Sequence, residues 1–219
     1  STYLSDTFAV GIAYDVPITE TSTFGIGYDI SLTEFTQTIG SPKVVTHHIA
    51  DHGKTALGLK LKANYVTDTR NRTVFAETGV LTSLTGDLFI GASGASHASA
   101  THRTESNKNY ILKTFGFDWR TVFQLKTTVG IGVGLGGTTS LPFYNKYFAG
   151  GNGTVRGYKG ASLGPLTYNA PSTLAGSGFR SCAAKSIPGK YRKCDAIGGD
   201  FLTVAQFNWV FSPPPLLGE

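Results

Sequence analysis

The sequence has few charged residues, only two cysteines and no long apolar run. Charged residues make up 15% of its 219 residues, compared with about 25% in a typical soluble domain. No stretch of about 18 apolar residues is present, so no transmembrane helix is predicted. The N-terminus lacks the basic, apolar and small-residue regions of a signal peptide. The near-zero mean hydropathy does not exclude membrane strands, because strands with one apolar face average out.

The sequence also lacks a catalytic or metal-binding constellation. His47, His48 and His52 lie in a polar connection where Asp51 is the obvious helper, and we expect solvent-exposed histidines rather than metal ligands. Gly53-Lys54-Thr55 lacks the upstream glycine of a phosphate-binding loop. No serine, histidine and acid are spaced for nucleophilic catalysis. The sequence therefore predicts no cofactor, no metal and no enzyme.

The net charge of +5 is concentrated in residues 137–198. Eight basic residues and Asp195 give this stretch about +7, which leaves about −2 for the rest of the chain. No stripe of aromatic and basic residues accompanies the charge, so nucleic-acid binding is not expected. If the stretch lies outside a cell, its cations could face lipopolysaccharide phosphates.

Apolar residues alternate with small or polar residues in most of the chain, which indicates β-strands with one apolar face. The pattern predicts seven strands of about ten residues, with polar connections at residues 36–53 and 94–108, a tight turn near Arg120 and a long loop over residues 137–198. Strands of this length match transmembrane strands. A soluble β-sandwich, whose strands usually have about five or six residues, is the alternative. The predicted strands are Thr7–Val16, Phe24–Leu32, Leu57–Tyr65, Val80–Ala92, Ile111–Trp119, Phe123–Leu135 and Phe201–Phe211.

Aromatic residues near the strand ends could form girdles at the two membrane surfaces. They are Tyr14, Tyr28, Tyr65, Trp119 and Trp209. Seven strands cannot close a single-chain bacterial barrel, which has an even number, and an open sheet leaves edges that lipid cannot satisfy. We therefore expect the chain to be part of a larger barrel.

The long loop has a glycine-rich centre around one arginine. Val155-Arg156-Gly157-Tyr158 follows Gly150 and Gly151, and glycines permit backbone paths that are closed to other residues. A guanidinium in this position suits bidentate pairing with a carboxylate. A basic tip in a mobile surface loop is the alternative.

Three glycines alternate along the strand that precedes the loop. Gly130, Gly132 and Gly134 have a period of two, which does not match a dinucleotide-binding motif. We expect them to face inward where a loop packs closely.

The two cysteines, Cys182 and Cys194, lie in the same loop. Their spacing and neighbours do not complete a zinc site. We expect a disulfide, which would contribute about 3 kcal/mol and indicates an oxidising compartment. Two free thiols are the alternative.

The segment PFYNKYFAGGNGTVRGYKGASLGP resembles the loop that carries the VRGF/Y signature in outer-membrane protein insertases of the BamA type, within the polypeptide-transporting β-barrel superfamily. The similarity extends, in hairpin order and spacing, over nearly the whole chain. The resemblance implies an all-β, antiparallel transmembrane barrel of sixteen strands, of which residues 1–219 would form about the sixth to the twelfth. The POTRA repeats and the remaining strands would lie outside this chain.

The resemblance also implies roles for the loop. Residues 137–198 would fold back into the barrel lumen, and Arg156 would contact acidic side chains on the inner wall, encoded after Glu219. Val155, Gly157 and Tyr158 would shape the loop tip.

The implied function is the folding and insertion of β-barrel proteins into the bacterial outer membrane. Implied partners are unfolded outer-membrane proteins, accessory lipoproteins, and outer-membrane lipid with lipopolysaccharide. A two-partner secretion pore of the same superfamily is the first alternative. Further alternatives are a passive porin or adhesin barrel and, last, a soluble β-sandwich binding module.

Overall fold

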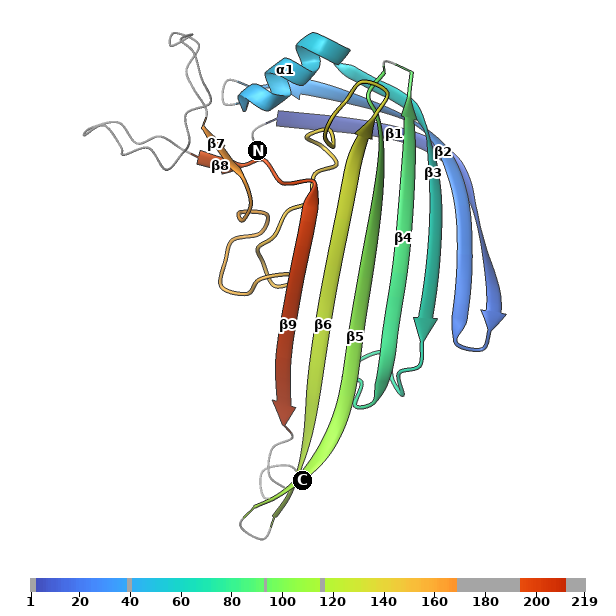
Figure 1. The fold of residues 1–219 in the computed structure, drawn as a ribbon, viewed down its shortest axis with the longest axis vertical. Helices are drawn as coiled ribbons and strands as arrows, with labels where there is room; N and C mark the ends of the chain where they lie inside the picture. Colours follow the sequence, from blue (N-terminus) through green and yellow to red (C-terminus); the bar gives the residue numbers. More distant parts are fainter. Residues whose placement is uncertain (1–2, 39–40, 93, 115–116, 169–193, 212–219) are drawn as a thin grey trace, which may run out of the picture.

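The fold is one long antiparallel sheet, seen in a computed structural model that describes residues 3–38, 41–92, 94–114, 117–168 and 194–211. Within these residues, seven strands lie in the order β1-β2-β3-β4-β5-β6-β9 (Figure 1). They are β1 (Tyr3–Thr19), β2 (Ser22–Gln37), β3 (Thr55–Asp68), β4 (Gly79–Gly91), β5 (Ser96–Thr114), β6 (Phe117–Leu135) and β9 (Phe201–Phe211). The predictions of an all-β fold and of seven strands in an open antiparallel sheet are confirmed.

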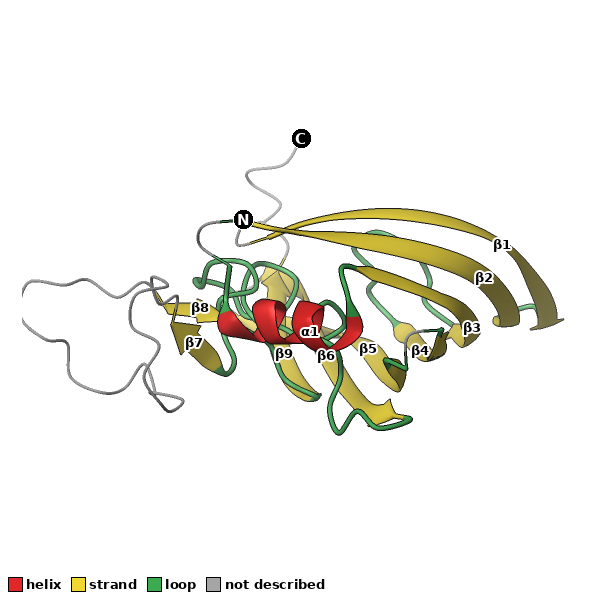
Figure 2. Cartoon of the chain, turned by 90° about the horizontal axis from the view of Figure 1, so that it is seen from above, coloured by secondary structure: helices red, strands yellow, loops and turns green. Residues whose placement is uncertain are grey.

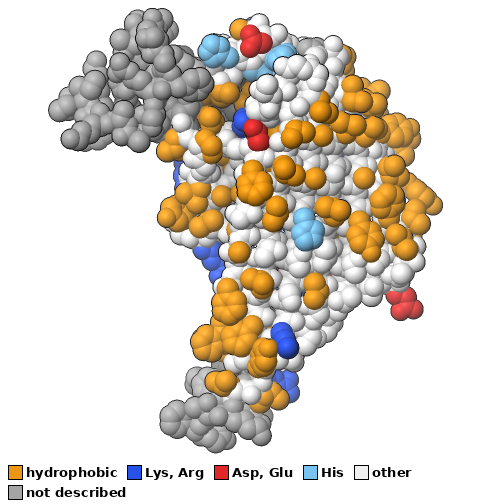
Figure 3. Space-filling view, viewed as in Figure 1, with side chains coloured by type: hydrophobic (Ala, Val, Ile, Leu, Met, Phe, Trp, Pro, Cys, Tyr) orange, Lys and Arg blue, Asp and Glu red, His pale blue; other side chains and the backbone are white. Residues whose placement is uncertain are grey.

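The sheet has one apolar face that the chain itself leaves uncovered. On β1, Phe8, Val10 and Ile12 are 70%, 63% and 65% exposed, because successive side chains of a strand point to opposite faces. Hydrophobic side chains are spread over the visible outer face, and charged ones are sparse there (Figure 3). Such a large exposed apolar surface is unusual for a soluble monomer and is typical of a surface that faces lipid.

The sheet curves like a trough, and the loop segments lie on its concave side (Figure 2). Charged side chains on this inner face include Asp29, Lys62 and Lys126, and Asp29 forms an ion pair with Lys62. A small second sheet forms within the long loop from β7 (Leu166–Tyr168) and β8 (Cys194–Ala196).

The predicted loop at residues 94–108 and the predicted turn near Arg120 are wrong. Residues Ser96–Thr114 form β5, and β6 begins at Phe117, so Ile111 and Trp119 belong to two different strands. β5 pairs with β6 along its whole length, from Ser96 opposite Leu135 to Thr114 opposite Phe117. Both faces of β5 are rich in small or polar residues, so the strand lacks the apolar alternation on which the prediction relied. Its backbone is instead held by hydrogen bonds to β4 and β6.

The predicted polar connection at residues 36–53 contains a helix, α1 (Lys43–His52). The helix follows Pro42 and ends before Gly53, whose N–H donates to the carbonyl of Ile49 at 2.9 Å. Gly53 has a φ of +87°, a value that favours glycine. It lies over the loop end of the sheet (Figure 1). No described helix is long and apolar enough to cross a membrane.

The core of the described chain lies beneath α1. Val45 and Phe35 are each 1% exposed, and Phe143 from the start of the long loop packs against them. The prediction that all three α1 histidines are solvent-exposed holds for His47 and is wrong for His48 and His52, which are partly buried with their ring centroids 4.9 Å apart. The His48 ring centroid lies 5.2 Å from that of Phe143, because the helix turns this side chain toward the aromatic cluster.

Candidate functional site

The segment after β6 turns back and follows the inner face of the sheet. Leu141, which is 1% exposed, donates its N–H to Asp200 Oδ1 at 3.0 Å. Lys146 Nζ donates to the same oxygen at 3.1 Å. Asp200 immediately precedes β9, so one carboxylate joins the two ends of the long loop. We call residues 138–148 the loop stem.

The loop stem lies directly on the glycines of β6. A Cβ added to Gly130 would lie 2.7 Å from the Tyr147 ring, and one added to Gly132 would lie 2.3 Å from Leu141 Cδ1. At Gly134 the added atom would lie 2.4 Å from the carbonyl oxygen of Thr138. Real Cβ atoms do not approach this closely, so these positions require glycine or a displaced stem.

Tyr147 is the polar anchor of the stem. Its hydroxyl lies 3.1 Å from Thr101 Oγ1 and 3.1 Å from the carbonyl oxygen of Ala100. Its backbone exchanges two hydrogen bonds with Gly199, each at 2.9 Å. A second anchor joins the Asn145 side chain to His97 Nε2 on β5. The stem is therefore bonded to β5 and to the residues just before β9.

Beyond the stem, residues 150–158 form a compact loop tip. Gly151 N–H donates to the carbonyl of Tyr158 at 3.0 Å. Thr154 Oγ1 accepts from Gly150 N–H at 2.8 Å. Gly150 and Gly157 have φ values of +112° and +86°, which favour glycine. The side chain of Gln206 on β9 donates to the carbonyl of Thr154, so the tip also contacts the inner wall.

The four residues of the VRGY motif lie at this tip. Val155 is half-buried, while Arg156, Gly157 and Tyr158 are exposed. Arg156 lines a cavity of about 610 Å³ together with Glu105 and Lys126. Within the described part of the chain, Arg156 forms no ion pair, although the cavity brings it to the charged wall.

The wall of that cavity contains an acid-centred cluster around Glu105 of β5. Lys126 Nζ lies 3.2 Å from Glu105 Oε2, and Arg70 Nη1 lies 3.4 Å from Oε1. Gln124 and Asn107 donate to Glu105 Oε1, each at 3.1 Å. Arg70 comes from the β3–β4 turn, so the cluster ties this turn to the wall. Sequence reasoning missed Glu105 because its strand was predicted to be a loop.

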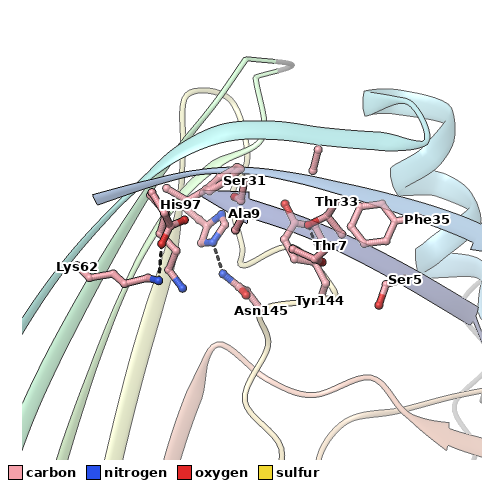
Figure 4. A pocket seen from close by; sticks show the side chains of 14 residues that line it. Ser5, Thr7, Ala9, Ser31, Thr33, Phe35, Lys62, His97, Tyr144 and Asn145 are labelled. Carbon is pink, nitrogen blue, oxygen red and sulfur yellow. Dashed lines mark hydrogen bonds and ion pairs between the residues drawn. The ribbon is translucent and has the colours of Figure 1, made fainter. Parts of the chain in front are cut away.

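A second cavity, of about 340 Å³, lies on the inner face near α1 (Figure 4). Its lining combines Lys62, paired with Asp29, with the aromatic rings of Phe35 and Tyr144. Burial raises the pKa of Tyr144 to about 12, because a phenolate is poorly solvated there. Burial also lowers the pKa of His48 in the adjoining aromatic cluster. The aromatic cluster beside this cavity is a packed junction between α1 and the loop stem.

The predicted disulfide is not tested. Cys182 lies outside the described residues, and for Cys194 the structure describes the backbone within β8. Among the described residues, no group of three or more histidine, cysteine or acidic side chains is placed to hold a metal ion.

Comparison with known proteins adds family information to this geometry. Residues 1–217 match the model of the Omp85 superfamily domain. The chain is 29% identical over 178 residues to the outer membrane protein assembly factor BamA of Neisseria meningitidis serogroup B, strain ATCC BAA-335 / MC58. That alignment covers 76% of this chain and 21% of the relative, so the chain spans about a fifth of the curated protein.

The fold also matches a solved structure. The crystal structure of BamA from Haemophilus ducreyi lacking POTRA domains 1–3 superposes with a TM-score of 0.76 at 19% identity. The match covers 99% of this chain and 39% of that one. At this identity the likeness shows the fold alone. The chain has the fold of one part of a larger β-barrel.

Proposed function

Because the chain belongs to the Omp85 superfamily, we propose that the complete protein folds β-barrel proteins and inserts them into the outer membrane. The chain is a segment of a bacterial outer-membrane β-barrel. The observation that carries the functional proposal is the similarity to a curated assembly factor over 76% of the chain. The proposed substrates are unfolded outer-membrane proteins.

The proposed mechanism uses strand pairing rather than covalent chemistry. A client strand would add to an exposed edge of the insertase barrel, since unpaired N–H and C=O groups of an edge accept a further strand. No nucleotide hydrolysis and no cofactor are part of this proposal. Accessory lipoproteins, outer-membrane lipid and lipopolysaccharide are its further proposed partners.

Residues 137–198, of which 169–193 lie outside the described residues, are proposed to enter the lumen of the complete barrel and to brace its wall. Support comes from the loop stem, which packs on Gly130, Gly132 and Gly134 of the inner face. Arg156 is proposed to pair with an acidic side chain encoded after Glu219, and Val155, Gly157 and Tyr158 to shape the tip around it. Gly150 and Gly151 are proposed to support that shape. Loss of one partner of such a buried pair would cost about 3–5 kcal/mol.

The function is tested with the complete protein and its lipoproteins in liposomes. An unfolded barrel protein is added, and its folded fraction is followed by heat-modifiable migration in gels. Faster folding than in empty liposomes is expected. Translocation of the added protein into the vesicle interior, without insertion, would support a secretion pore instead.

The loop role is tested by complementation in a strain that depends on the complete protein. Arg156→Ala is expected to impair growth and barrel assembly more than Lys159→Ala, a matched loss of one exposed cation three residues away. Equal tolerance of the two variants would refute the role of Arg156.

A further inference from the structure

The loop tip contains the one Asn-Gly pair of the sequence, Asn152-Gly153. The N–H of Thr154 donates to the carbonyl of Gly151 at 3.1 Å, so these four residues form a β-turn with Asn152 and Gly153 at its two central positions. Both central residues are exposed. The pair therefore lies at the apex of the tip, where water can reach it.

The two groups of this pair that react with each other are both unbonded. In a β-turn the N–H of the third residue has no partner within the turn, and the Gly153 N–H has none elsewhere among the described residues. The side-chain amide of Asn152 also forms no hydrogen bond within the described part of the chain. A Cβ added to Gly153 would meet no atom within 4 Å. No neighbouring group therefore shields the Gly153 nitrogen or holds the Asn152 amide in place.

This arrangement suits loss of the side-chain amide by an intramolecular attack. The Gly153 nitrogen gives up its proton to hydroxide and attacks Cγ of Asn152, and the amide nitrogen leaves as ammonia. The resulting cyclic succinimide is opened by water at either carbonyl, which gives aspartate or isoaspartate. The net reaction consumes one water and releases one ammonia, with no oxidation or reduction. A glycine favours the attack because it has no Cβ beside the nitrogen, and one turn holds both groups close together.

The charge of the tip favours the reaction and gives its product a consequence. Residues 150–160 carry Arg156 and Lys159 and no acidic residue, a net charge of +2. Nearby positive charge stabilises the negative charge that develops on the attacking nitrogen and on the carbonyl oxygen. A new carboxylate at position 152 removes one unit of this positive charge. The attraction between the tip and an acidic acceptor on the wall becomes weaker as a result.

We propose that Asn152 is a site of spontaneous deamidation, and that the carboxylate formed there loosens the loop tip from the barrel wall. The first part depends on the geometry of the turn. The second part rests on the proposed role of Arg156. Deamidation gives the complete protein an irreversible change at this tip, which accumulates with time.

The modification is tested on the complete folded protein in detergent, incubated at neutral and at mildly alkaline pH. Peptide mass spectrometry follows the replacement of the amide nitrogen by oxygen at position 152, and labelling with an isoaspartate methyltransferase detects isoaspartate. Asn152 is expected to be converted, and faster at the higher pH, because hydroxide removes the proton. Asn145 is the internal control. Its side chain is bonded to His97 and the next residue is Lys146, so it should remain intact.

A substitution examines the attacking group. Gly153→Ala should slow the conversion of Asn152 about tenfold or more, because the added methyl group hinders the nitrogen and restricts the backbone. The open space around Gly153 allows this variant to fold, and heat-modifiable migration verifies that it does. Equal rates in the wild type and Gly153→Ala would overturn the proposal. An intact Asn152 in the folded protein, after a time in which the urea-unfolded protein is converted, would also overturn it.

The effect on the tip is tested with Asn152→Asp beside Asn152→Ser, which removes the amide without adding a charge. Proteinase K is expected to cut the loop of the folded Asp variant about two- to fivefold faster, the effect of one exposed charge, and added salt should reduce this difference. Equal cleavage, or a difference that salt leaves unchanged, would overturn the loosening by charge. Neither assay measures the folding of client proteins, so failure of this proposal is distinguishable from failure of the proposed function.

Discussion

The contact between Gly132 and Leu141 is the most sensitive test of how the loop stem is held. In Gly132→Ala, the added Cβ would lie 2.3, 2.6 and 2.8 Å from three atoms of the Leu141 side chain. Leu141 is 1% exposed and its N–H is bonded to Asp200, so the side chain cannot move aside without loosening the stem. Overpacking of this kind costs about 1–3 kcal/mol.

A double-mutant cycle identifies the cause of that cost. Leu141→Ala alone should destabilise by about 2–5 kcal/mol, because it leaves a cavity under the stem. The same change removes the three atoms that the new methyl group would meet. We therefore expect Gly132→Ala to cost little in the Leu141→Ala background, with a coupling of about 1–3 kcal/mol between the two sites.

The measurement is urea unfolding of the complete protein in detergent, followed by heat-modifiable migration, together with protease sensitivity of the loop. Gly86→Ala is the control. It adds the same methyl group to a strand glycine on the opposite face, where no atom lies within 4 Å, and it should be neutral or slightly stabilising. Additive effects of Gly132→Ala and Leu141→Ala would refute the proposed packing of the stem on the wall.

Three further predictions concern the stem and α1. Asp200→Ala removes the acceptor shared by Leu141 and Lys146 and should lower the unfolding free energy by about 1–2 kcal/mol, given the partial exposure of the carboxylate; Asp6→Ala, on the outer face, is its control. Tyr144→Phe should leave stability unchanged or raise it by about 1 kcal/mol in the same urea assay, because the buried hydroxyl has no partner among the described residues. Burial lowers the pKa of His48 below its ordinary value of 6.5. As the pH falls, this histidine therefore binds a proton in the unfolded state before it does so in the folded state. The docking of α1 should weaken as the pH falls below about 6.5. Hydrogen-exchange protection of the α1 amides, compared at pH 7 and about 5.5, measures this effect, and His48→Phe should abolish it.

The sequence predicted most strands of the sheet because the alternation of apolar residues that marks a strand is a local pattern. On β1, β2, β3, β6 and β9, apolar residues recur at every second position, and a strand turns alternate side chains to opposite faces whatever its neighbours are. The same reasoning failed for β5. Its residues are small or polar on both faces, including His102 and Glu105, and the strand exists because β4 and β6 supply partners for its backbone groups.

The helix α1 was missed for a related reason. Its ten residues carry a weak apolar pattern, and an isolated helix of this length is marginal in water. Val45 and His48 are held by Phe35 and Phe143, which are distant in the sequence. Packing therefore decides that these residues form a helix.

The sequence alone determined the class of fold, the direction in which the apolar faces point and the glycine-rich character of the loop tip. All three depend on local backbone geometry and on residue type. The tertiary structure decided which side chains meet: Asp200 binds Leu141, 59 residues earlier, and Arg156 shares a cavity with Glu105. Such contacts depend on strand register and on the path of the loop through space, and these are settled by the free energy of the whole sheet rather than by any short stretch of residues.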